Sequence, residues 1–478
     1  MSRQISRTST GAAAVSIFAS ALLLSACASL PTPGDLPFIS SPEKFESEKS
    51  LAVAPAAWPS DRWWQEFNDP QLSGLIDEGL RNAKDMRIAQ ARFARAEAIA
   101  RQAGSRLLPT IDAGGSVSVA KQSSNYLTPE QATPDGWQDY GQVGIGLSWD
   151  LDFWGRNRAA LAAAESDVDA AAAEAAAARL IVSAGIADAY AELARLYAER
   201  DAATNAIEVR RQTLNLMSRR ASEGLENSAA VDRARSALAT AEGDLAALDE
   251  SIALTRNRIA ALMGAGPDRG LTIARPAPTA KRTFGLPANL PADLIGRRPD
   301  IVAARQLTRS AASRIDVAEA AFYPNVNLIG VIGLQSLGLN ALTQSGSDFG
   351  AFGPAVTLPI FNGGLLTGRY REAEATYQAA VAEYDGTLTR ALREVADVTA
   401  SYQALDLRLG RALEAERAAA SAWKVASDRY RGGLGTYLDV LAAEDVLILA
   451  RRNVAILQSR AFALDVALVR ALGGGFRS

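Results

Sequence analysis

Apolar and polar residues alternate with a period of two in two stretches of the first half of the chain. Every odd position of residues 143–153 is apolar, whereas the even positions are glycine, serine or aspartate. Residues 111–119 alternate in the same way. A period of two is typical of a strand whose faces meet different surroundings. The pattern therefore predicts two strands that pair as a hairpin.

The strand predicted over residues 143–153 has the length and the faces of a membrane strand. About 9–11 residues cross a bilayer when apolar side chains face lipid and polar ones face water. Asp150 and Asp152 are then expected to face a water-filled pore, and Leu147 and Leu151 to face lipid. Large aromatic residues gather at one end, as interfacial residues do, at Trp149, Phe153 and Trp154. A half-buried periplasmic sheet is the alternative.

Long helical segments follow the predicted strands. Residues 156–223 contain no proline, and residues 363–431 form the equivalent segment of the second half. Each would span on the order of 100 Å at 1.5 Å per residue. The last helix carries an apolar stripe at spacings of three and four, at Val440, Ala443, Leu447, Ala450, Val454, Leu457, Ala461, Leu464 and Leu468. Such helices are expected to pack side by side, although a soluble coiled coil has the same periodicity.

The second half of the chain repeats the first. LDFWGR near residue 151 matches LPIFNGG near residue 358, and RASEGLENS at 220–228 matches RYRGGLGTY at 429–437. The offset from Asp188 onward is a constant 209 residues (188 against 397), which indicates an internal duplication. The repeat predicts two more strands, at 326–334 and 352–360, where the alternation is weaker and includes two prolines.

Four strands per chain cannot close a membrane barrel. An open sheet edge in hydrocarbon leaves backbone groups without hydrogen bonds. Bacterial barrels have at least eight strands, so two or more chains are expected to pool theirs. The predicted fold class is mainly α with a transmembrane β-barrel, in which each chain adds four strands and a long periplasmic helical part.

The first residues have the layout of a secretory signal peptide, with arginines ahead of a short apolar stretch. That stretch ends in LSAC, the pattern of a bacterial lipobox, so Cys27 is expected to carry lipid; an ordinary signal peptide with an accidental cysteine is the alternative. Ala28, rather than an acidic residue, follows the cysteine and indicates the outer membrane. The expected divisions are a signal peptide (1–26), a lipid-anchored extended tether (27–66), a first repeat (67–265), a proline-rich crossover (266–290) and a second repeat (291–475).

The two matching turns between the long helices contain glycine and capping residues. Gly224 and Gly433 suit the left-handed conformation that ends a helix. Asn227 or Ser228, and Thr436, suit the N-cap of the next helix. These residues are accounted for by two tight turns.

Two leucines at the same turns need a further explanation. Leu225 and Leu434 are apolar residues at the tips of hairpins that project into water, beside Arg220 and Arg429. Several chains would gather these leucines into one apolar ring rimmed by charge. Such a ring is typical of a docking surface.

Composition argues against an enzyme. Histidine is absent, and the chain has one cysteine and a net charge of −3. The commonest general base and zinc ligand is therefore missing, and the charge gives no reason to expect nucleic acid. No cofactor is expected other than a covalent lipid on Cys27, and no metal.

Long motifs after the tether resemble the outer membrane factor family of TolC-type channels, specifically its NodT-like branch of efflux lipoproteins. They are WWQEFNDPQL, LSWDLDFWGRNR, LPADLIGRRPDI, AAFYPNV, FGPAVTLPIFNGG, RYRGGLGTYLDVL and ALGGG. The resemblance implies a homotrimer with a shared twelve-stranded outer-membrane barrel above a periplasmic tunnel of twelve helices. It places a periplasmic adaptor at the tips, at Arg220, Gly224, Leu225, Arg429, Gly433, Leu434 and Thr436. Relatives also hold a gate shut with acidic residues near this tip; Gly435 stands where several have aspartate, which leaves Asp439 as the gate candidate.

The function that the resemblance implies is a passive exit duct for small toxic compounds. An inner-membrane pump, usually of the resistance–nodulation–division type, would deliver these compounds through the adaptor. Two alternatives remain open. One is the exit duct of a type I protein-secretion system, and the other is a non-porous, lipid-anchored periplasmic coiled-coil scaffold.

Overall fold

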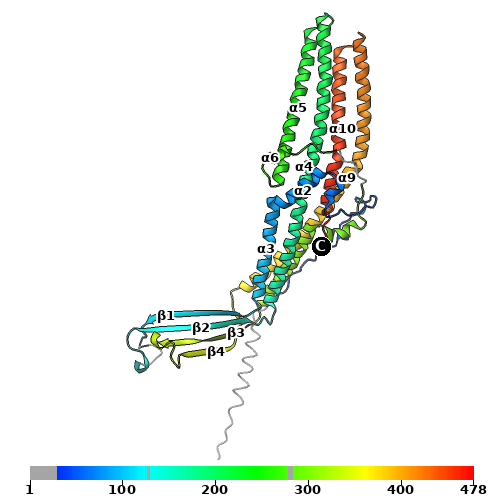
Figure 1. The fold of residues 1–478 in the computed structure, drawn as a ribbon. Coiled ribbons are helices and arrows are strands. Elements are labelled where there is room, and N and C mark those ends of the chain that lie inside the picture. The colour runs from blue at the N-terminus through cyan, green and yellow to red at the C-terminus, as the bar shows by residue number, and fades with distance from the viewer. Residues whose placement is uncertain (1–29, 124, 126–129, 278–283, 478) are drawn as a thin grey trace, which may run out of the picture. The chain divides into compact units, whose positions relative to one another are not determined.

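The structure is a computed structural model that describes residues 30–123, 125, 130–277 and 284–477 (Figure 1). Cys27 and the predicted signal peptide lie outside the described residues. The chain divides into two compact units, and each unit takes segments from both halves of the sequence. The first unit includes Ala94–Asp169 and Arg305–Glu383, and the second includes Ala170–Ala304 and the residues from Tyr384 onward.

The first unit contains one antiparallel sheet of four strands (Figure 1). The strands are β1 (Thr110–Ala120), β2 (Gln138–Asp150), β3 (Asn325–Leu337) and β4 (Asp348–Thr357). Their order in the sheet is β1-β2-β3-β4, so a hairpin from each half of the chain lies beside the other. The two hairpins predicted from the alternation are therefore present, and they join into a single sheet.

The register of the sheet places the apolar positions of its strands on one face. Leu147 of β2 lies opposite Ile111 of β1 on one side and Gly330 of β3 on the other, and Gly330 pairs in turn with Phe352 of β4. The opposite face is polar in the first hairpin, where Ser148 pairs with Thr110. In the second hairpin this face also carries apolar residues such as Val331, which pairs with Ala351. The weaker alternation of the second hairpin is thus a property of the folded sheet.

Two predicted strand ends are wrong. The strand predicted to run to residue 153 ends at Asp150, so Leu151 and Asp152 are not strand residues. Asp152 has φ of 48°, a left-handed conformation that turns the chain out of the sheet. The strand predicted over 352–360 ends at Thr357 and leaves Pro359 outside, whereas Pro354 lies within β4. Within the single chain β4 is an edge strand, the position in a sheet where proline is usually found.

The long helices form two hairpins of equal dimensions (Figure 1). Helices α4 (Arg156–Ser222) and α9 (Leu365–Arg431) each contain 67 residues, and α5 (Ser228–Leu262) and α10 (Tyr437–Ala471) each contain 35. Helix α9 begins 209 residues after α4 (365 against 156), and α10 begins 209 residues after α5 (437 against 228). Each element of one hairpin therefore has an equivalent of the same length in the other.

The described part of the chain also contains shorter helices. They are α2 (Pro70–Asn82), α3 (Lys84–Ser105), α6 (Asp268–Leu271), α7 (Leu290–Arg297), α8 (Pro299–Ala320) and the 3₁₀ turns η1 (Pro42–Lys44), η2 (Trp63–Phe67), η3 (Glu130–Ala132) and η4 (Leu339–Ala341). Among the described residues, α4 is the one helix long and apolar enough, by length and composition, to cross a membrane. Its apolar character owes much to alanine, which fills thirteen of the twenty positions 159–178. Alanine lets helix backbones approach closely at little entropic cost.

Two residues at the end of the segment 27–66, which was predicted as an extended tether, are buried. Trp63 and Trp64, assigned to the tether 27–66, are each 1% exposed and belong to the largest apolar core of the second unit. They pack there with residues of α2 and α4 such as Leu72 and Tyr190. Burial of two tryptophans stabilises this segment by several kcal/mol, at roughly 1.5–3 kcal/mol for each large apolar side chain. Trp63 and Trp64 therefore belong to the folded second unit.

A buried arginine joins three helices in the second unit. The side chain of Arg298, which directly precedes α8, is 8% exposed. Its Nη1 donates to a carboxylate oxygen of Glu394 in α9 at 2.7 Å and to the carbonyl oxygen of Ala471, the last residue of α10, at 3.0 Å. Its Nε and Nη2 donate to the two carboxylate oxygens of Asp300. The guanidinium is thus fully engaged in a charge-assisted cluster.

Candidate channel wall and hairpin tips

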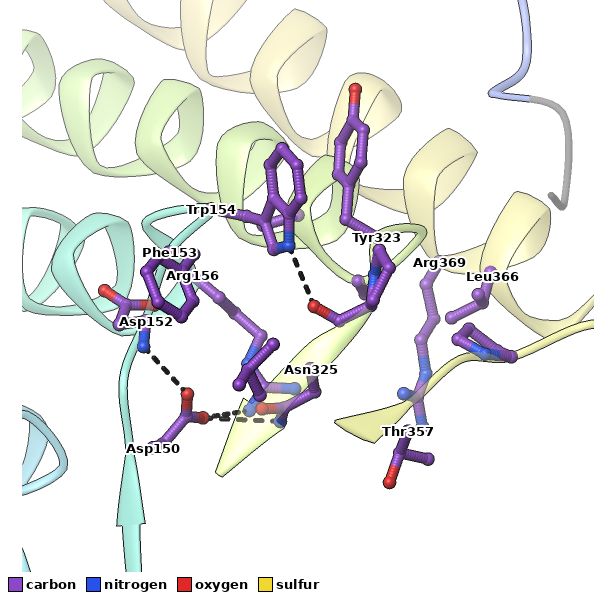
Figure 2. A pocket seen from close by; sticks show the side chains of 15 residues that line it. Asp150, Asp152, Phe153, Trp154, Arg156, Tyr323, Asn325, Thr357, Leu366 and Arg369 are labelled. Atoms are coloured by element: carbon purple, nitrogen blue, oxygen red, sulfur yellow. Dashed lines mark hydrogen bonds and ion pairs between the residues drawn. The ribbon is translucent and has the colours of Figure 1, made fainter. Parts of the chain in front are cut away.

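Two aspartates hold the turn from β2 into α4. The Asp150 carboxylate accepts hydrogen bonds from Arg156 Nη2 at 2.9 Å and from the backbone nitrogen of Asp152 at 3.0 Å (Figure 2). The Asp152 carboxylate accepts from the backbone nitrogens of Asn157 at 2.8 Å and Arg158 at 3.0 Å. These are N–H groups of the first turn of α4, which no residue of the helix itself can satisfy. A strand with aspartates at its end therefore runs into a helix because the second aspartate caps that helix.

This geometry separates the two residues that were predicted to face the pore. Asp150 is the last residue of β2, on the same face as Ser148. Asp152 lies beyond the strand, and its side chain is 7% exposed and paired with Arg158. The interpretation of Asp152 as a residue of the barrel strand is therefore wrong, because its carboxylate is used in the turn.

Aromatic residues surround the same turn. Trp149 Nε1 donates to the carbonyl oxygen of Leu107 at 3.0 Å, and Trp154 Nε1 donates to that of Pro324 at 2.8 Å. The Trp154 ring stacks on Tyr323 with a centroid distance of 4.7 Å. These indoles are partly exposed, yet their polar atoms are satisfied, which is the amphipathic arrangement that suits a membrane interface.

The outer edges of the sheet are open. Among the described strands, β1 pairs only with β2, and β4 pairs only with β3. Both edges therefore present backbone N–H and C=O groups that can pair with another strand. Large apolar side chains on the shared face, including Ile111, Ile145 and Phe352, are also exposed.

The two hairpin tips have the same backbone geometry. Gly224 and Gly433 have φ of 71° and 75°, so both adopt the left-handed conformation that favours glycine. The backbone nitrogen of Leu225 donates to the carbonyl oxygen of Arg220 at 2.8 Å, and Leu434 makes the same bond to Arg429. The Leu225 and Leu434 side chains are 60% and 74% exposed. The structure thus leaves both leucines facing solvent at the ends of the hairpins.

Each tip also supplies the residue that caps the start of the next helix. The Asn227 side chain accepts a hydrogen bond from the backbone nitrogen of Ala230 at 3.0 Å, so Asn227, rather than Ser228, is the N-cap of α5. Thr436 caps α10 and forms a reciprocal capping box with Asp439. The gate candidate Asp439 therefore stabilises the start of α10 within its own chain. Hydrogen bonds from Thr436 lower the pKa of its carboxyl, so it stays ionised at neutral pH.

Contacts that the sequence did not indicate tie the two tips together. Tyr430 of α9 donates a hydrogen bond to the Glu226 carboxylate of the first tip at 2.7 Å. The Arg220 guanidinium lies over the Tyr430 ring, 4.6 Å from its centroid. Burial, followed by the hydrogen bond to Glu226, raises the pKa of the Tyr430 hydroxyl. The one feature of the sequence that could have indicated this contact is Tyr430 itself, because the equivalent position of the first turn is Ala221.

Known proteins are similar to this chain over most of its length. The outer membrane protein VceC of Vibrio cholerae has a solved structure that is 46% identical, with a TM-score of 0.83 over 88% of this chain and 100% of that one. The fusaric acid resistance protein FusA of Burkholderia cepacia is 35% identical over 76% of this chain and 70% of its own length. The multidrug resistance outer membrane protein MdtP of Escherichia coli K12 is 29% identical over 97% of this chain and 96% of its own.

An open-edged four-stranded sheet combined with paired long helices is thus the fold of an outer-membrane channel subunit, as the sequence predicted. The family model described as outer membrane efflux protein matches residues 75–265 and 290–474. The chain belongs to the outer membrane efflux protein family.

Proposed function

We propose that this protein is the outer-membrane channel of a tripartite efflux system. Small toxic compounds would reach it from an inner-membrane pump through a periplasmic adaptor and leave the cell passively through its lumen. The observation that carries the proposal is the sheet, whose exposed apolar face and open edges suit a lipid-facing wall shared between chains. Family membership and the resistance phenotypes in the names of FusA and MdtP support it.

The assembly proposed is a homotrimer with twelve pooled strands. Pairing of β4 of one chain with β1 of the next would leave no open sheet edge, which the hydrocarbon region requires, although Pro354 has no N–H to donate to the new ladder. Two chains would give eight strands, the smallest bacterial barrel. The family resemblance favours three.

The adaptor is proposed to bind at the tips, where Leu225 and Leu434 are exposed. Three chains would present six such leucines beside Arg220 and Arg429. A pump of the resistance–nodulation–division type would complete the pathway. Asp439 remains the gate candidate, because its ionised carboxylate lies at the tip, where three copies would meet.

Attachment through Cys27 is the remaining part of the proposal. A triacylated cysteine buries far more methylenes than one myristoyl chain, at about 0.8 kcal/mol each, so the anchor would be effectively permanent. Cys27→Ser is expected to block both lipidation and removal of residues 1–26. Metabolic labelling with radioactive palmitate tests this, and equal label in the variant would exclude Cys27 as the acceptor.

The channel itself is tested by conductance. Purified protein in planar bilayers is expected to open stable pores, and a strain that lacks its outer-membrane efflux channel is expected to regain drug resistance when this protein is supplied with its pump and adaptor. Membrane insertion without conductance would favour the non-porous scaffold. Restored secretion of a protein substrate without restored drug resistance would favour the type I secretion duct.

A further inference from the structure

The face of the sheet that carries Ser148 is polar in one hairpin and apolar in the other. In β1 and β2 most of its side chains are serine, threonine, glutamine or aspartate, and several positions are glycine. In β3 and β4 it carries a group of apolar residues, here called the lumen patch: Ile329, Val331, Phe349 and Ala351. In the proposed channel this face borders the water-filled pore. The inner wall of a membrane barrel is ordinarily polar, so the lumen patch departs from the usual pattern.

The residues of the lumen patch are neighbours on the folded sheet. Val331 pairs with Ala351, and Phe349 pairs with Gly333, which lies two residues further along the same face of β3. A Cβ added at Gly333 would lie 3.0 Å from Cε1 of Phe349, so this ring extends over the glycine. The Ile329 and Val331 side chains are 48% and 36% exposed. Pooling of strands between chains would cover the edges of the sheet and leave this face open.

A carboxylate lies across the sheet from the lumen patch. Asp112 of β1 pairs with Gly146 of β2, and Gly146 pairs in turn with Val331. Two strand spacings separate the backbones of Asp112 and Val331 by about 10 Å. A Cβ added at Gly146 would meet nothing nearer than 3.9 Å, so the space above this glycine is open. A strip without side chains therefore connects a carboxylate on one side with apolar residues on the other.

The Asp112 carboxylate is not neutralised by the chain. Of the two aspartates that the strands place on this face, Asp150 is paired with Arg156 at 2.9 Å. Asp112 is exposed, and no lysine or arginine of the described residues lies within ion-pair distance of it. None of the four strands contains a lysine or an arginine. The charge of this face therefore favours cations over anions.

We infer that the strip between Asp112 and the lumen patch is a transient binding site for amphiphilic cations, and that such compounds are among the cargo of the channel. The cationic group would lie beside the Asp112 carboxylate, and the apolar arm would cross Gly146 to reach Val331 and Ile329. The inference rests on the proposed function, because that function places this face in the pore. Exposed charge pairs are weak, so a compound would bind and leave readily, as conduction requires.

Block of the ion current tests the inference. Full-length protein in planar bilayers conducts potassium chloride, and we measure the probe concentration that halves the current. Phenylbutyltrimethylammonium has a cationic group and an apolar arm, tetramethylammonium lacks the arm, and phenylbutanesulfonate has the same arm with a negative charge. We expect phenylbutyltrimethylammonium to block at about tenfold lower concentration than either of the others, because it alone makes both contacts.

Two pairs of variants separate these contacts. Asp112→Asn should raise the half-blocking concentration of phenylbutyltrimethylammonium about threefold. Asp348→Asn is its control, because Asp348 is an exposed aspartate on the opposite face of the sheet, where it pairs with Leu334. Val331→Thr keeps the shape of the side chain but replaces a methyl group by a hydroxyl, and should raise the concentration about threefold. Ile332→Thr is its control, one residue away on the opposite face.

Several outcomes would overturn the inference. Equal block by all three probes, or equal effects within either pair of variants, would exclude the site. A higher current in Val331→Thr without any probe, with block unchanged, would make the lumen patch a hydrophobic barrier to ions instead.

Calorimetric titration of the solubilised protein with phenylbutyltrimethylammonium measures binding without conduction. Binding that Asp112→Asn weakens, in a protein that opens no pores, would support the site and count against the proposed function. Pores without preferential block would count against the site alone.

Discussion

Thr436 and Asp439 hydrogen-bond each other reciprocally at the start of α10. Asp439 Oδ2 accepts from the Thr436 backbone nitrogen at 3.0 Å, and Thr436 Oγ1 accepts from the Asp439 backbone nitrogen at 3.3 Å. Each side chain thus satisfies an N–H group that the helix leaves open. A residue proposed for the gate is therefore also part of the fold of its own hairpin.

Acid is expected to loosen this tip. Hydrogen bonds from Thr436 lower the pKa of Asp439 below its ordinary value of 3.8. A lowered pKa contributes stability that is present above the unfolded value and is lost as pH falls through the folded one. We therefore expect fraying of the first turn of α10 below about pH 4, measured as amide exchange corrected for its intrinsic rate. Asp439→Asn should lack this pH dependence, and Thr436→Ala should fray at every pH, at about 1 kcal/mol. Identical pH profiles for wild type and Asp439→Asn would contradict the prediction.

The two faces of β2 are expected to respond differently to a charge. Leu147 lies on the apolar face, opposite Ile111, and its neighbour Ser148 lies on the polar face. Leu147→Arg would cost roughly 2–4 kcal/mol per chain near mid-bilayer and should reduce the amount of trimer in the outer membrane. Ser148→Arg, one residue away, should assemble normally. Quantitative blots of unheated outer-membrane samples compare the two, and the reverse ranking would mean that the faces are assigned the wrong way round.

The exposed leucines of the tips are expected to be needed for efflux but not for folding. Leu225→Asp combined with Leu434→Asp removes apolar surface that packs against no core of its own chain. Trimer level and membrane insertion should stay unchanged, while drug resistance is lost. Crosslinking from position 434 should capture the adaptor. Wild-type resistance in the double variant would show that the tips are only turns.

Loss of the buried Arg298 cluster is expected to destabilise the second unit. Arg298→Met leaves the carboxylate of Glu394 and the carbonyl oxygen of Ala471 without their donor. Breaking a buried ion pair in this way costs about 3–5 kcal/mol. The neighbouring Arg297, whose guanidinium lies over the Trp58 ring, provides the control, because Arg297→Met should cost about 0.5–1 kcal/mol. Thermal unfolding of the purified protein compares them, and equal effects would argue against the cluster.

The strands and the long helices could be predicted because their periods differ. Period-two alternation placed Leu147 and Ile111 on one face before any pairing was known, and the glycines and capping residues marked the helix ends to within a residue or two. The strand end was missed because Leu151 and Phe153 continue the apolar alternation beyond Asp150. An apolar side chain can continue the pattern beyond the last residue that pairs with a neighbouring strand, so alternation alone does not locate the end of the strand.

Contacts between distant segments could not be predicted in this way. Tyr430 and Glu226 are 204 residues apart, and no local pattern signals their hydrogen bond. The burial of Trp63 and Trp64 was also missed, because both fall at the end of the segment 27–66 that was predicted as an extended tether. Such contacts depend on which helices lie side by side, and periodicity in one segment carries no information about its partner.

The equal lengths of the two hairpins limit the insertions and deletions that the long helices can accept. Each residue added to a helix moves its end by about 1.5 Å and turns it by about 100°. One extra residue in α4 would therefore displace Leu225 relative to Leu434 and turn its side chain to another side of the hairpin. We therefore expect a change in length to keep both tips in place only when it adds close to a whole number of turns to both arms of both hairpins. Because the helices have matched lengths of 67 and 35 residues, a change in one hairpin would have to be matched by the same change in the other.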